Sequence, residues 1–376
     1  MTRPRVSAGI VWSTSAPIPA GRAQLGLARA GGLDSFWAVD HLISPFPKAV
    51  WDPDFTFLAK KTSTPDEAYD FATMLGHLAG KAGRMRLGVG VTDPHRRHPA
   101  LLAQTFLTLS HLTKRAPILA LGAGERENLD PYGIEHSQPV SRVEEALQVL
   151  RACLDADGSV DFDGKFFQLD KAVMDLRPPR PDRAPQLWLG ANGPRMLALT
   201  GKYADGWYPW ELVPPSEYER RLSIVTKSAL TAGRDPDRIE AAQVITYVAG
   251  SNQQNVEKLL RSKAVRYLGL FASAAEWANH GVDHPLGPDY TGPVDLMPHR
   301  YSRSEMLRAI DAVPDELIRQ RMLVGTPKQL LSRIRDLVDV GLRHAVLVPA
   351  SALVSPADAA FGLGSALWMA NRLRHG

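Results

Sequence analysis

The chain has 376 residues, of which 44% are apolar and 22% are charged, the composition of a globular protein. Its 44 basic and 40 acidic residues are scattered and give a net charge of +4, which argues against a nucleic-acid partner. The single cysteine, Cys153, excludes an internal disulfide and suits a reducing compartment. The apolar run at 361–370 is about half the length that a bilayer requires. We therefore expect a cytoplasmic protein with no membrane span.

Short apolar runs alternate with helical patterns along the first half of the chain. Strands are predicted at 6–12, 36–39, 86–91 and 118–121. Helices are predicted at 20–30, at 65–82 with acids in the first turn, at 99–112, and at 141–154 with a capping box formed by Ser141 and Glu144. The proline-containing loop at 42–63 is long enough to indicate a functional insertion.

The same alternation continues in the second half. A hairpin is predicted at 161–169, and strands are predicted at 186–189, 205–208, 242–248 and 345–348. Helices are predicted from 194, at 217–232, at 327–340 and after Pro356. The stretch 251–322 is irregular and contains only short helical pieces.

Eight strands that alternate with helices predict an α/β protein with a (β/α)8 TIM barrel. We expect one domain over residues 1–376, with insertions at 42–63 and 251–322 over the carboxyl ends of the strands. The alternative is an open doubly wound sheet, which fits less well because no G-x-G-x-x-G sequence opens the first helix.

The carboxyl end of the second strand is the first candidate site, because ligands bind at this end of parallel strands. Asp40 and His41 follow the apolar run 36–39 directly. In the functional interpretation they face a ligand. In the alternative, Asp40 caps a turn and His41 makes one backbone hydrogen bond.

Three other strand ends carry small or polar residues. Glycines at 88 and 90 indicate a close backbone approach, and the sequence GAGEREN at 122–128 offers backbone NH groups and an acid, Glu125. The sequence GANGPR at 190–195 leads into a helix whose N-terminus suits an anion such as phosphate. His95 and His98 do not match a metal-ligand spacing, so no metal site is expected.

Together these motifs resemble the bacterial luciferase-like superfamily, and within it the branch that uses coenzyme F420. The resemblance covers nearly the whole chain. It depends on five motifs in the correct order: W-x-V-D-H at 37–41, LGVGVTDP and RHPALLAQ within 87–104, GAGERENLDPYG at 122–133, LWLGANGPRMLALTGKYADGW at 187–207, and VGTPKQLLSRIRDLVDVGLRHAVL at 324–347. The sequences GERENLDPYG, GPRMLALTGKYADGW and HGVDHPLG (280–287) resemble those of phthiodiolone ketoreductases.

The resemblance assigns expected roles to individual residues. It implies that Asp40 and His41 meet the deazaflavin ring and that a non-proline cis peptide at Gly90-Val91 supports the ring from behind. The remaining cofactor contacts that it implies are Thr92, Asp93 and Asn128 around the ring, and Ala191, Asn192 and Gly193 on the phosphate. Glu125 matches the acid after the fourth strand, and Asn192 replaces a glycine of some relatives.

The implied activity is an oxidoreductase that transfers a hydride between C5 of coenzyme F420 and a carbonyl or alcohol substrate. His41 is the first candidate for the proton donor, and Glu125 is the second. The main alternative is an FMN-dependent monooxygenase on the same barrel. A metal-dependent barrel hydrolase and a cofactor- or lipid-binding protein without turnover are further alternatives.

The insertions raise the question of substrate size. They contain large apolar side chains, which would line a channel for a lipid ketone or form the insertions' own cores; these are Trp51, Phe55, Phe57, Leu268, Leu270, Phe271 and Trp277. The resemblance also implies a homodimer.

Overall fold

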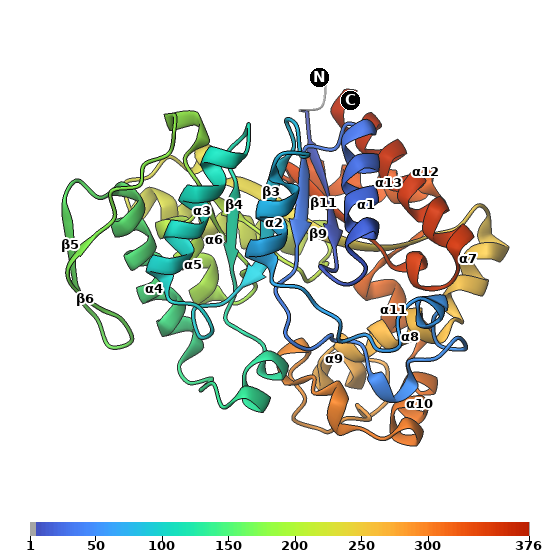
Figure 1. Cartoon of the computed structure of the whole chain (residues 1–376). Coiled ribbons are helices and arrows are strands. Elements are labelled where there is room, and N and C mark those ends of the chain that lie inside the picture. Colours follow the sequence, from blue (N-terminus) through green and yellow to red (C-terminus); the bar gives the residue numbers. More distant parts are fainter. Residues whose placement is uncertain (1–4, 376) are drawn as a thin grey trace.

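The computed structural model describes residues 5–375, in which eight parallel strands close into a barrel (Figure 1). The barrel strands are β1 (Ser7–Trp12), β2 (Ser35–Ala38), β3 (Arg86–Thr92), β4 (Ile118–Leu121), β7 (Gln186–Leu189), β8 (Gly206–Trp207), β9 (Glu240–Ala249) and β11 (His344–Pro349). Each strand pairs with the next in this order, and β11 pairs with β1 to complete the ring. The TIM barrel predicted from the alternation of strands and helices is confirmed.

Helices cover the outside of the barrel. They are α1 (Ile18–Ala30), α2 (Phe71–Ala79), α3 (Pro99–Leu112), α4 (Pro139–Asp155), α5 (Pro194–Tyr203), α6 (Pro215–Thr231), α12 (Pro327–Asp339) and α13 (Pro356–His375). In α12, Thr326 and Gln329 form a capping box, and the apolar side chains recur at helical spacing and are buried. Inside the barrel, Trp37 and Trp188 pack with smaller apolar residues from the other strands.

Several local predictions are wrong. The helix predicted from Pro65 begins only at Phe71, because Asp70 caps it. Ser141 and Glu144 do not form a capping box; both bind Arg195 instead. A short strand that the sequence reading missed, β10 (Leu323–Gly325), pairs with the end of β9.

The two insertions lie together at the end of the barrel opposite the termini (Figure 1). The first holds the 3₁₀ turns η1 (Lys48–Val50) and η2 (Phe57–Lys60). The second holds α7 (Gln253–Leu260), α8 (Lys263–Tyr267), α9 (Ala274–Ala278), α10 (Arg303–Asp311) and α11 (Asp315–Arg321). They share one hydrophobic cluster, in which Phe55, Leu270 and Trp277 are buried. Most of the side chains considered for a lipid channel therefore belong to a core.

A hairpin of β5 (Ser159–Asp163) and β6 (Gln168–Val173) follows α4 and projects from the barrel (Figure 1). Within residues 5–375, no helix combines the length and the apolar character that a membrane crossing demands.

Candidate active site

Asp40 follows β2 and is buried, and its carboxylate joins two strand-end loops. Thr92 Oγ1, at the end of β3, donates a hydrogen bond of 2.6 Å to Asp40 Oδ2. Guanidinium nitrogens of Arg96 and Arg97 lie 3.2 and 3.3 Å from the same oxygen. Because a hydroxyl and two cations converge on one buried carboxylate, Asp40 fixes the loop after β2 to the loop after β3.

Asp93 completes this arrangement. Its Oδ2 accepts a 2.6 Å hydrogen bond from Arg96 Nε, and its Oδ1 accepts the backbone amides of His95 and Arg96. Arg96 therefore bridges Asp40 and Asp93, both of which are buried. The sequence reading gave no role to Arg96 or Arg97, which lie between the two histidines that do not match a metal-ligand spacing. The signal that it missed is that two acids at adjacent strand ends need counter-charges.

The Nδ1 atom of His41 faces side chains that follow β4. Asn128 Nδ2 lies 3.0 Å from it, Glu127 Oε1 lies 3.2 Å from it, and Glu125 Oε2 lies 3.7 Å from it. Asn128 Oδ1 accepts the amides of Leu42 and Ile43, so its amino group is turned toward His41. Asn128 can thus donate to a neutral Nδ1, and Glu127 can accept from a protonated one. The site accommodates both protonation states of His41.

The electrostatics favour the protonated state of His41. Burial by itself lowers the pKa of His41, but the carboxylates of Glu125 and Glu127 raise it to about 9. Burial raises the pKa of Glu127, although His41 acts in the opposite direction. Glu127 has 2% of its surface exposed, and its Oε2 has no hydrogen-bond partner among the described residues. Sequence reasoning missed Glu127, which stands only two positions after Glu125.

Three strand ends meet closely at Val91. A Cβ atom on Gly122 would lie 2.6 Å from Val91 Cγ2, and one on Gly190 would lie 3.1 Å from Val91 Cγ1. A Cβ atom on Gly90 would lie 2.5 Å from the Tyr208 hydroxyl oxygen. The Gly90-Val91 peptide is cis, as the resemblance implies. Only residues without a side chain allow this approach, and the result is a tightly packed floor at the ends of β3, β4 and β7.

Tyr208 underlies this floor and was also missed from the sequence. Its ring packs 4.5 Å from that of Trp37, and its buried hydroxyl has no partner within the described part of the chain.

The loop 191–193 lies at the start of α5. Ala191 is buried, and its carbonyl accepts a hydrogen bond of 2.8 Å from Trp207 Nε1. Asn192 and Gly193 are exposed, and no side chain caps the helix that begins at Pro194. Uncapped amides at a helix N-terminus can hold an anionic group.

These features fit a flat cofactor that carries a phosphate. The glycine floor would support a ring, the start of α5 would hold the phosphate, and the unpartnered Glu127 oxygen is a polar group at the same strand ends. His41, Glu125 and Glu127 also place one potential metal-ligand atom each within 4.8 Å of one another, a grouping that was not expected from the sequence. Hydrogen bonds within the cluster already join these groups, so we draw no metal site from it.

The profile of the luciferase-like monooxygenase family matches residues 4–344, and the chain belongs to this family. It is 39% identical over 350 residues to the phthiodiolone/phenolphthiodiolone dimycocerosates ketoreductase of Mycobacterium tuberculosis, covering 92% of this chain and 91% of that protein. These similarities make the chain an oxidoreductase.

Solved structures share the fold. An F420-dependent secondary alcohol dehydrogenase in complex with an F420-acetone adduct superposes with a TM-score of 0.76 at 23% identity, covering 99% of this chain and all of that one. A riboflavin lyase with modified FMN reaches a TM-score of 0.69 at 14% identity, covering 98% and 92%. At these identities the likeness shows the barrel fold alone.

Proposed function

We propose that this chain is a coenzyme F420-dependent oxidoreductase that transfers a hydride between C5 of the deazaflavin and a carbonyl or alcohol substrate. The observation that supports this best is a histidine with a raised pKa at a strand end beside a glycine floor. The 39% identity to a ketoreductase over most of both chains supports the same reaction class. When bound, the coenzyme supplies the hydride chemistry.

The chain itself supplies a proton and positions the reacting groups. His41 is the proton donor to the oxygen of a ketone undergoing reduction, because its pKa of about 9 keeps it protonated at neutral pH. Glu127, only 3.2 Å from Nδ1, stabilises the imidazolium and leaves Nε2 free to face the substrate. In the oxidation direction the neutral His41 accepts the proton at Nε2, while its Nδ1–H group donates to Glu127 before and after the transfer.

Asp40 acts as a positioning residue in this proposal. Its carboxylate is occupied by Thr92 and two arginines, so its part is to hold the backbone that carries His41. Thr92, Asp93 and Asn128 position the loops beside the ring, and Gly90 and Val91 form the floor under it. Ala191, Asn192 and Gly193 bind the phosphate at the start of α5.

The second candidate function is an FMN-dependent monooxygenase on the same barrel. The riboflavin lyase structure with modified FMN shares the fold, so the architecture by itself suits either cofactor. Titration of the protein with each cofactor separates the two: the proposal requires tighter binding of coenzyme F420 than of FMN.

The proposal extends to the substrate class, the domain organisation, the location and the oligomeric state. A lipid ketone as substrate is supported by the similarity to the mycobacterial ketoreductase. The large apolar side chains of the insertions do not add support, because most of them pack in a core. We also propose a single domain over residues 1–376 with insertions at 42–63 and 251–322, a cytoplasmic location and a homodimer.

The test of the proposal is the His41→Ala variant. We expect ketone reduction with reduced coenzyme F420 to fall by about 100-fold or more in kcat, with coenzyme affinity nearly unchanged. His111→Ala is the matched control, because His111 is exposed on α3, where its Nε2 atom lies 2.8 Å from the Arg177 carbonyl oxygen. Unchanged turnover in His41→Ala would remove His41 as the proton donor and leave Glu125 as the remaining candidate.

A further inference from the structure

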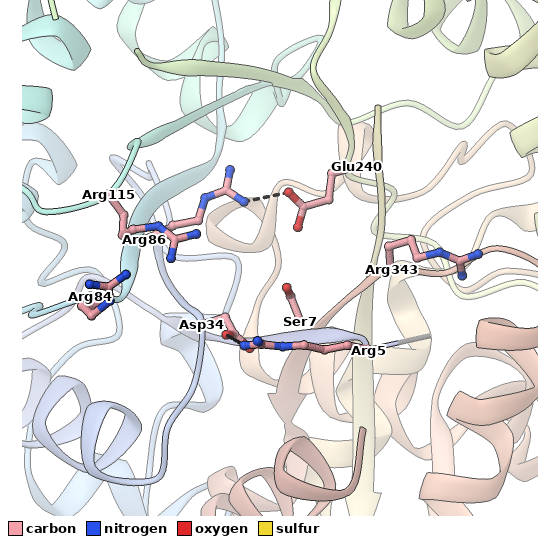
Figure 2. A pocket seen from close by; sticks show the side chains of 8 residues that line it. All are labelled: Arg5, Ser7, Asp34, Arg84, Arg86, Arg115, Glu240 and Arg343. Carbon is pink, nitrogen blue, oxygen red and sulfur yellow. Dashed lines mark hydrogen bonds and ion pairs between the residues drawn. The ribbon is translucent and has the colours of Figure 1, made fainter. Parts of the chain in front are cut away.

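A basic cavity lies at the amino-terminal end of the barrel, opposite the candidate active site. It has a volume of about 380 Å³, and Figure 2 shows the residues around it. They stand at or just before the first residues of the strands, and they are Arg5, Ser7, Asp34, Arg84, Arg86, Arg115, Glu240 and Arg343. The surface therefore combines five guanidinium groups with two carboxylates.

A second cavity adjoins the first. Its volume is about 480 Å³, and it shares Arg84 and Arg115 with the first cavity. It adds Lys114, Arg180, Asp182 and Arg183. The two cavities together carry eight basic and three acidic side chains, a net charge of +5, whereas the whole chain carries +4. The rest of the protein is therefore close to neutral, and the excess positive charge is concentrated on this face.

The carboxylates already have partners. Glu240 binds His344 at 2.6 Å and Arg86 at 2.7 Å, and these two partners lower its pKa to about 2 although burial acts to raise it. Asp34 pairs with Arg5, and Asp182 pairs with Arg180. The acids of this face thus do not neutralise its remaining cations.

Several cations remain without a partner. Within residues 5–375, the side chains of Arg84, Lys114, Arg115 and Arg183 make no ion pair or hydrogen bond, and Arg84 and Arg115 lie where the two cavities join. Arg86 is 9% exposed, and its buried Nε has no partner although its other nitrogens bind Glu240 and Gln186. The exposed guanidinium groups of Arg84 and Arg115 are the donors that a ligand can reach, whereas the Nε atom of Arg86 is buried.

We propose that the two joined cavities bind a polyphosphate chain, either free or as part of a nucleoside triphosphate. Guanidinium groups form paired, charge-assisted hydrogen bonds with phosphate oxygens, and an extended chain of phosphates matches cations that are spread over two adjoining cavities. A single phosphate would reach only some of them. This site is separate from the coenzyme site, so binding does not depend on the proposed redox function.

The test is calorimetric titration of the full chain with tripolyphosphate, with ATP and with inorganic phosphate. We expect saturable binding of tripolyphosphate, weaker binding of inorganic phosphate, and affinity that falls as salt concentration rises. Equal affinity for ATP and tripolyphosphate indicates recognition of the phosphate chain alone. Tighter binding of ATP indicates that the nucleoside also contributes, and both results support the site.

The variant Arg84→Gln/Arg115→Gln removes the two unpartnered cations at the junction and breaks no hydrogen bond or ion pair among residues 5–375. Its affinity for tripolyphosphate should fall by about tenfold or more. The control Arg308→Gln/Arg333→Gln removes the same charge from exposed positions on α10 and α12 and should bind normally. Absence of saturable binding at millimolar tripolyphosphate, or equal losses in the two double variants, would overturn the proposal.

Discussion

The pKa of His41 depends on Glu127, and the Glu127→Gln variant tests this dependence. Glutamine keeps the size of the side chain and an acceptor oxygen but removes the charge that lies 3.2 Å from His41 Nδ1. Two unit charges at that distance interact by about 5 kcal/mol at an effective dielectric constant of about 20. Glu125, at 3.7 Å, remains in the variant.

We therefore expect the pKa of His41 to fall below its value of about 9 in Glu127→Gln, because one of the two carboxylates that raise it is gone. Only the protonated form of His41 donates the proton to the ketone. The pH above which the rate of ketone reduction declines should therefore fall by the same amount as the pKa of His41. At pH 8.5 the rate relative to that at pH 7 should fall about threefold or more below the wild-type ratio.

The assay is kcat/KM for ketone reduction measured between pH 6 and 10, together with NMR titration of the His41 ring, which reports the pKa without turnover. Glu316→Gln is the matched control, because Glu316 is exposed on α11 and far along the chain from the cluster. If the basic limb and the NMR titration of Glu127→Gln both coincide with those of the wild type, the electrostatic account of His41 is wrong.

Three further predictions concern stability. Asp40→Asn removes the buried carboxylate that Arg96 shares with Asp93 and Arg97 shares with Asp70, and it should lower the free energy of unfolding by about 2 kcal/mol, measured by urea unfolding; a loss below about 1 kcal/mol contradicts this. Gly90→Ala places a Cβ atom 2.5 Å from the Tyr208 hydroxyl oxygen and should cost about 1–3 kcal/mol, read from the shift in Tm; an unchanged Tm shows that the floor can relax. Glu240 has its pKa lowered to about 2, so its stabilising contribution is present above about pH 4.5 and is lost as the pH falls toward 2. In Glu240→Gln the free energy of unfolding should therefore fall less between pH 6 and pH 2 than it does in the wild type. An equal fall in both proteins would assign the loss of stability to other groups.

Much of the barrel was accessible from local patterns. The bounds of α3, β4 and β7 were predicted to the residue, because proline, glycine and short apolar runs mark the ends of these elements directly. The predicted start of α2 was wrong, because the acids after Pro65 are typical of the first turn of a helix. Asp66 instead accepts the amide of Ser44, a contact with a distant loop that no local pattern reveals.

In the candidate site too, local patterns show which residues lie at the strand ends but not which partners they bind. The sequence identifies Asp40, His41 and Asn128 because they follow apolar strands, and the carboxyl ends of parallel strands meet at one edge. It cannot distinguish which partner each side chain has. The carboxylate of Asp40 proved to be held by arginines, whereas His41 is paired with Glu127, a residue that nothing in the local pattern singled out.

The sequence by itself determined the barrel and the strand ends that carry polar residues, because both depend on short-range periodicity and on residues that end elements. Only the tertiary structure decided which carboxylates lie beside His41 and raise its pKa, and which scattered arginines lie together on one face. Both depend on distances between side chains from separate strands, and closure of the barrel brings those side chains together.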